Sequence, residues 1–224
     1  MKMTKDIAPS SLELRETSER ALQLQAYLLR RAWGALYAAW ATAVFVDIFV
    51  TSVVAAALPS EFTYALHVIV SMIANGTAVA VSLRAFRRVH DTAEIRDAIS
   101  NRKWTRPLGY RAMVLLWVAV YLAIIPTLIF FSSFAVSVVL LIYATFAVYL
   151  YYSLRLSFED KIPLESVFAL SSLAAATIGS FILEFLFFMD IDAPYALLWG
   201  STIIAWIIAS VYARTRKPPS VAGV

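Results

Sequence analysis

The chain has 224 residues, of which 61% are apolar and 15% are charged, and its mean hydropathy is +0.75. A soluble domain of this size could not bury so much apolar surface, so the composition predicts a single helical membrane domain. The absence of Cys excludes disulfides, thiolate metal ligands and a Cys nucleophile. The net charge of +4 is explained by membrane topology, and we expect no nucleic-acid partner.

Residues 1–32 predict an amphipathic helix that is cytoplasmic or lies at the membrane interface. Ser10 and Glu13 form a capping-box pattern, and Glu16 and Arg20 are spaced for an i,i+4 ion pair. No Gly or Pro occurs between residues 11 and 33, so the helix either continues into the first span or lies in the headgroup layer. Its expected apolar side carries Leu14, Ala21, Leu24 and Leu28.

Six apolar runs are long enough to cross about 30 Å of hydrocarbon, which predicts an all-α bundle of six transmembrane helices over residues 33–213. Residues 108–154 are almost continuously apolar, and we divide them at 126–133, where a proline and two serines occur. Residues 84–111 form a cytoplasmic connector with a short helix that begins near Asp91, and residues 214–224 form a tail. The predicted spans are 34–57, 65–83, 112–131, 134–153, 167–188 and 194–212.

The basic residues predict how these spans are oriented. All 19 Lys and Arg residues precede the first span, follow the last, or lie in the connectors after the second and fourth spans. The other connectors carry only Glu61, Asp190 and Asp192 as charged residues. Because short cytoplasmic loops are enriched in Lys and Arg, we expect a multi-pass protein of the cell membrane with both termini in the cytoplasm.

The first span carries an acid near its middle, Asp47. A central Asp costs roughly 2.5 to 3.5 kcal/mol on insertion scales, so such residues are the first candidates for function. In the second span Ser71 and Asn75 repeat the i+4 spacing, and we expect Asn75 to meet Asp47 near the midplane. The first-span stripe that contains the acid consists of Ala35, Ala39, Ala43, Asp47, Thr51 and Ala55.

The fifth and sixth spans carry similar stripes, namely Ser172, Ala176, Ser180 and Glu184, and Ser201, Ala205 and Ala209. We expect Glu184 to form a second polar pair with His67, nearer the outer surface. Spans one, two, five and six would then form the core, with spans three and four towards lipid. The candidate intramembrane site is therefore Asp47, Thr51, His67, Ser71, Asn75, Ser180 and Glu184.

The sequence offers little support for catalysis. It has two His and no Cys, and it lacks GxSxG, P-loop, HExxH and TVGYG-like motifs. We therefore assign no catalytic, metal or cofactor-binding residues and expect no cofactor. An enzyme is not favoured, although one that acts on lipid stays as a third reading.

Two functional readings rank above the enzyme. The first is a small transporter or channel for a cation, a proton or a small polar solute that uses Asp47. The second is a non-catalytic accessory or structural subunit of a membrane complex, in which Asp47 only holds helices together. In either case we expect the partners to be the lipid bilayer and either further copies of the chain or another membrane protein.

Overall fold

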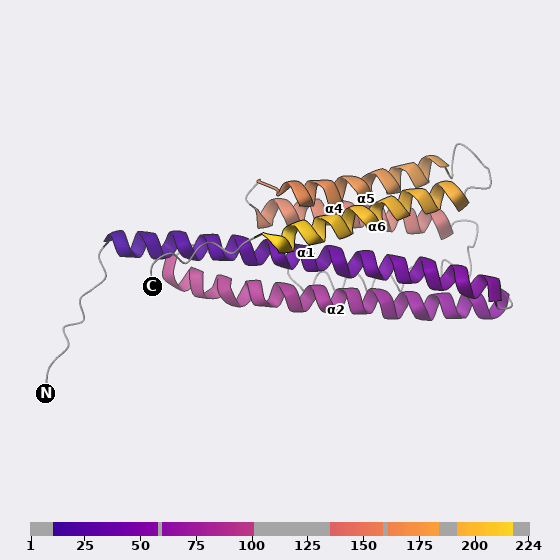
Figure 1. The fold of residues 1–224 in the computed structure, drawn as a ribbon, viewed down its shortest axis with the longest axis horizontal. Helices are drawn as coiled ribbons and strands as arrows, with labels where there is room; N and C mark the ends of the chain where they lie inside the picture. Colours follow the sequence, from indigo (N-terminus) through magenta and orange to yellow (C-terminus); the bar gives the residue numbers. More distant parts are fainter. Residues whose placement is uncertain (1–10, 58–59, 101–134, 159–160, 184–191, 217–224) are drawn as a thin grey trace, which may run out of the picture.

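The structure is a computed structural model that describes residues 11–57, 60–100, 135–158, 161–183 and 192–216. Its regular structure is helical, which confirms the all-α class, and the helices lie roughly along one common direction (Figure 1). The helices are α1 (Ser11–Ala57), α2 (Ser60–Ser100), α4 (Ala135–Ser157), α5 (Leu164–Ile182) and α6 (Asp192–Thr215).

Helix α1 joins the predicted N-terminal helix to the first span without a break. Its 47 residues extend for about 70 Å at about 1.5 Å per residue, more than twice the thickness of the hydrocarbon core. Of the two alternatives that the sequence left open, the continuous helix is the one adopted, and the N-terminal part keeps the direction of the rest of α1 (Figure 1).

Helix α2 is also longer than predicted. It has 41 residues, about 61 Å, and continues through Gly76 and the basic segment to Ser100. The prediction of a separate helix that begins near Asp91 is wrong, because no Gly or Pro between Thr77 and Ser100 ends the helix that started at Ser60.

Four stretches within the helices are long and apolar enough to cross a membrane, which indicates a multi-pass membrane protein. Helix α4, with 23 residues, occupies the position of the predicted fourth span. The predicted third span, 112–131, and its turn into the fourth lie outside the described residues, so the count of six spans stays a prediction. The four stretches are Glu19–Val50 in α1, Ile69–Arg87 in α2, Leu164–Ile182 in α5 and Ala196–Thr215 in α6.

Helix α1 lies at the centre of the packing. Helices α2 and α6 pack against it, α5 packs against α6, and α4 packs against α5. Aromatic rings join α1 to three other helices: Trp33 meets Phe86 of α2 and Trp40 meets Phe146 of α4, each with centroids 5.2 Å apart, and Tyr37 meets Trp206 of α6 at 5.8 Å. The predicted contact of span one with span two is present, and the four spans expected to form the core are linked through α1 with α6 and α5 with α6.

The fourth span was expected to lie towards lipid, and Leu141 and Val148 of α4 are exposed, but the other side of this helix is buried. Phe146, Leu150 and Leu154 of α4 are buried in the same core as α1. Few polar residues occur in this helix, but lipid and the interior of a membrane protein are both apolar. Hydropathy therefore could not decide which of the two surrounds it.

The N-terminal part of α1 buries a different face from the one expected. Gln25, Leu29 and Ala32 are buried, whereas the predicted face residue Leu24 is 44% exposed. The leucines at 22, 24, 28 and 29 allow more than one apolar side, and the side that contains Leu29 is the one that joins the core. The expected pair of Glu16 and Arg20 is present, with 3.9 Å between Oε2 and Nη2.

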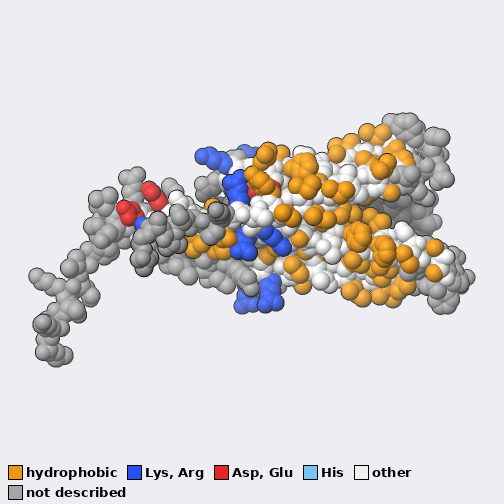
Figure 2. Space-filling view, in the orientation of Figure 1, with side chains coloured by type: hydrophobic (Ala, Val, Ile, Leu, Met, Phe, Trp, Pro, Cys, Tyr) orange, Lys and Arg blue, Asp and Glu red, His pale blue; other side chains and the backbone are white. Residues whose placement is uncertain are grey.

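Lys and Arg side chains gather in a band across one end of the bundle (Figure 2), which we call the basic belt. The band joins several helices at one level, since Trp33 and Phe86 meet at 5.2 Å and Arg30 pairs with Glu165. From Arg30 back to Ser11, α1 continues for 19 residues, about 28 Å, beyond the belt. The belt includes Arg30, Arg84 and Arg214, which the contacts of Glu165, Phe86 and Gly34 place at this level.

The close approach of α1 to α6 depends on Gly34. A Cβ at this position would lie 3.0 Å from Ala213 Cβ and 3.2 Å from the Ser210 carbonyl oxygen. We predict that Gly34→Val lowers the free energy of unfolding by about 1 to 3 kcal/mol, because the two helices must separate. Thermal unfolding in detergent would measure the loss. Gly200→Val is the control, since nothing lies within 4 Å of a Cβ there, and equal losses would contradict the prediction.

Candidate functional site

Two of the predicted site residues bond to each other within α2. The Asn75 side-chain nitrogen donates to the Ser71 backbone oxygen at 2.8 Å and to Ser71 Oγ at 3.1 Å. Both residues are half-buried. A polar side chain that bonds back to the preceding turn satisfies itself without a second helix. The Asn75 amide is thus already engaged within its own helix.

Asp47 lies on α1 at a level close to this pair. Its side chain is half-buried, with Oδ1 in the interior. Counting 14 residues towards the hairpin turn from the Trp33–Phe86 contact leads to Asp47 on α1 and to Met72 on α2. Ser71 and Asn75 therefore lie within about one helical turn of the level of Asp47. This agreement supports a polar group of Asp47, Ser71 and Asn75 as a proposal.

Ser180 occupies another part of the bundle, the interface of α5 and α6. It is fully buried and accepts a hydrogen bond from Trp199 Nε1 at 3.2 Å. Two further donors of α6 reach α5 backbone oxygens: Thr202 Oγ1 bonds Ser172 at 3.1 Å, and Trp206 Nε1 bonds Ala169 at 2.8 Å. These bonds hold two helices together, which is a structural task.

The remaining predicted residues cannot be placed in the site. Glu184 lies outside the described residues, and so do the side chains of Thr51 and His67. The proposed outer pair of Glu184 and His67 stays a prediction. Within the described part of the chain, no group of three His, Asp or Glu side chains is arranged to hold a metal ion.

Among the described residues, the most buried charged contact joins Glu165 of α5 to Arg30 of α1, a pair that the sequence did not lead us to expect. Glu165 Oε1 lies 3.3 Å from Arg30 Nε, and the two side chains are 3% and 27% exposed. Pro163 precedes α5 in an extended conformation, and Glu165 follows in the first turn. An acid in this position is stabilised by the positive end of the helix dipole.

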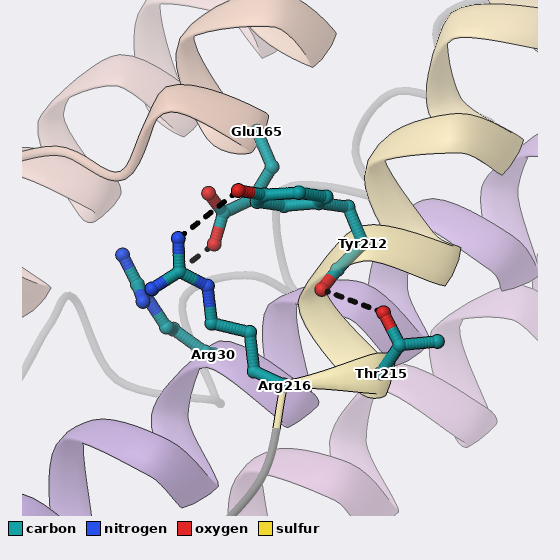
Figure 3. Close-up of polar contacts among 5 residues, drawn as sticks. All are labelled: Arg30, Glu165, Tyr212, Thr215 and Arg216. Carbon is teal, nitrogen blue, oxygen red and sulfur yellow. Dashed lines mark hydrogen bonds and ion pairs between the residues drawn. The ribbon is translucent and has the colours of Figure 1, made fainter.

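Helix α6 completes the surroundings of this pair. Figure 3 draws Tyr212 of α6 and Arg216, the residue that follows α6, together with Glu165 and Arg30. Arg216 Nη2 donates to the Tyr212 hydroxyl at 3.1 Å. On the interior side, the buried Tyr37 hydroxyl lies close to Glu165 and Ser166. The cluster thus connects α1, α5 and α6 at the level of the basic belt.

A signal for this contact was present in the sequence. Glu165 is an acid that follows Arg155 and Lys161 and stands at the start of an apolar run, on the side where basic residues collect. The topology argument counts only Lys and Arg on that side, so it does not identify Glu165. An acid at such a position can pair with an Arg from the start of another span, although only the fold shows that the Arg is Arg30.

Removal of Arg30 should destabilise the bundle strongly. Arg30→Met leaves the buried Glu165 carboxylate without its ion pair, so we expect a loss of roughly 3 kcal/mol or more in the free energy of unfolding. Arg31→Met is the matched control, because Arg31 is exposed and stacks over Tyr27 of its own helix at 5.6 Å. Its loss should stay within about 1 kcal/mol.

Thermal unfolding in detergent would measure both losses and so distinguish the buried contact of Arg30 from the surface contact of Arg31. Adding Glu165→Leu to Arg30→Met should restore much of the stability, because no unpaired charge is then buried. Equal, small losses for Arg30→Met and Arg31→Met would show that Glu165 does not depend on Arg30.

Comparison with known proteins assigns no relative to the chain. No protein-family model, no curated protein and no solved structure matches it. The coarse description therefore rests on the helices themselves: an all-α chain whose described residues include four candidate membrane-spanning helices, held together by an aromatic core and by a buried ion pair at its basic end.

Proposed function

We propose that the chain is a non-catalytic accessory subunit of a membrane complex, one that holds a rigid helical arm at the membrane surface. The observation that carries this proposal is the unbroken course of α1 from Ser11 through the bundle to Ala57. The part beyond the basic belt is about 28 Å long and belongs to the same helix as the core residues Trp33 and Tyr37. A partner bound to this arm would be held at a fixed height and direction.

The packing of the bundle interior supports this reading over a conduction path. Where α1, α4, α5 and α6 meet, the enclosed space is about 20 Å³ and is lined by aromatic rings that include Trp40, Phe146 and Trp206. A single water needs roughly 10 to 15 Å³. Within the described helices, this crossing therefore has room for about one water molecule.

The proposal includes an orientation in the cell membrane. The basic belt lies at the end of the bundle from which the arm projects. Lys and Arg are retained on the cytoplasmic side, so six spans with both termini and the arm in the cytoplasm agree with the charges. The arm would then meet a cytoplasmic protein or the cytoplasmic part of another membrane protein.

Deletion of residues 1–24 tests the proposal, because it removes most of the arm but leaves the buried Gln25 and Leu29 in place. We expect the full chain to elute from gently solubilised native membranes with a stoichiometric partner, and the shortened chain to elute without it. Unchanged thermal unfolding of the shortened chain is the control for folding. A full chain that elutes without a partner, or a complex that survives the deletion, would contradict the proposal.

A second candidate is transport, and the observation that favours it is the level shared by Asp47 with Ser71 and Asn75. Its test is Asp47→Asn, which keeps the shape of the side chain and removes the charge. Under the accessory proposal, vesicles with the wild type and with this variant should show the same proton, Na⁺ and K⁺ flux as empty vesicles. A wild-type flux that Asp47→Asn abolishes, and that the exposed control Ser52→Ala leaves intact, would instead establish transport.

A further inference from the structure

Two grooves run side by side along α2. The first has a volume of about 430 Å³ and lies between α2 and α1, with small residues on both walls; the second, of about 480 Å³, lies on the outer side of α2. Thr77 and Val81 line both grooves and form the ridge between them. Ala39 and Ala43 face Ala74 and Ala78 across the first groove, and Met72, Ile73 and Gly76 line the second.

The groove walls are apolar even where they contain hydroxyls. Thr42 Oγ1 donates to the Ala38 backbone oxygen and Thr77 Oγ1 donates to the Ile73 backbone oxygen, both at 2.8 Å. Each threonine thereby satisfies its hydroxyl within its own helix. What remains for an occupant of the grooves is a surface of methyl and methylene groups.

Helix α2 is the candidate span with the least protein around it. Only 11% of its most apolar stretch is buried, against 39% for each of the other three spans. Ile73 on the second groove is 64% exposed, and nothing lies within 4 Å of a Cβ placed on Gly76. Among the described helices, none covers the face of α2 that carries the grooves.

The first groove is about as long as the hydrocarbon part of one leaflet is thick. Ala35 and Val46, at its two ends on α1, are 11 residues apart, which corresponds to about 16 Å. Half of a 30 Å hydrocarbon core is about 15 Å. The groove begins at the basic belt, so it runs from headgroup level to about the midplane.

Each groove ends at an arginine of the basic belt. Arg214 lines the first groove and Arg84 lines the second. The two are at the same level: Arg214 Cγ lies 3.3 Å from the Cβ position of Gly34, and the contact of Trp33 with Phe86 places Arg84 opposite that part of α1. Guanidinium groups bind phosphate through charge-assisted hydrogen bonds.

We propose that the two grooves bind the two acyl chains of one anionic phospholipid of the leaflet at the basic belt, with its phosphate between Arg84 and Arg214. Basic sites between transmembrane helices are suited to anionic headgroups. A second copy of the chain fits less well. It would have the same orientation in the membrane, so its own arginines would lie at the same depth and repel these, whereas a phosphate complements them.

The headgroup part of the proposal is tested in nanodiscs that contain equal amounts of phosphatidylglycerol and phosphatidylcholine. After extraction into detergent, native mass spectrometry counts the lipids that remain bound. We expect the wild type to retain one phosphatidylglycerol and Arg84→Gln with Arg214→Gln to retain roughly tenfold less. Arg155→Gln with Lys161→Gln removes the same charge from α4 and the segment before α5, and should retain the lipid as the wild type does.

The acyl-chain part is tested by Gly76→Leu, which places a side chain in the second groove at a position where nothing lies within 4 Å of a Cβ. It should reduce retention of the lipid, whereas Gly200→Leu should not, because Gly200 has an equally open Cβ position but lines neither groove. Equal retention by the wild type and by the double Arg84 and Arg214 variant would overturn the proposal. So would a wild-type dimer that Gly76→Leu converts to a monomer, because a second copy would then occupy the face.

Discussion

Hydrocarbon offers no hydrogen-bond partner to a peptide group, so a chain that crosses it must satisfy its backbone within each helix. Helices α1 and α2 obey this constraint without a break from the far end of the bundle to well beyond the basic belt. The same constraint acts on small polar side chains. Thr42, Thr77 and Ser82 bond to carbonyl oxygens four residues earlier, so that the surfaces they present to neighbours are apolar.

Against this apolar background, a few polar contacts between helices determine the arrangement. Trp206 and Trp199 donate hydrogen bonds from α6 to α5, and Glu165 links α5 to Arg30 of α1. These bonds are specific because each buried partner has few alternatives. Helix α2, in contrast, meets α1 through small and apolar side chains, and only 11% of its apolar stretch is buried within the part of the chain that the structure describes.

The proposed accessory role and the proposed lipid site both concern the height of the N-terminal part of α1 above the bilayer. An arm that continues a membrane helix is useful to a partner only if its height above the bilayer is constant. A phospholipid bound between Arg84 and Arg214 would lie about one helical turn from the point where α1 leaves the belt. It would therefore fix the position of α1 relative to that leaflet. The ion pair of Arg30 and Glu165 acts at the same level and keeps α1 and α5 in register.

The amino-acid sequence by itself determined that the chain is all-helical, roughly where the described apolar helices lie, and that Asp47 is the unusual residue, because hydropathy, helix breakers and charge are local properties. Tertiary structure decided the rest. Only packing shows that Phe146 faces protein rather than lipid, that Gln25 rather than Leu24 is buried, and that Glu165 finds Arg30. The physical reason is that lipid and protein interiors are equally apolar, so a sequence pattern identifies a helix that can be buried but not the neighbour that buries it.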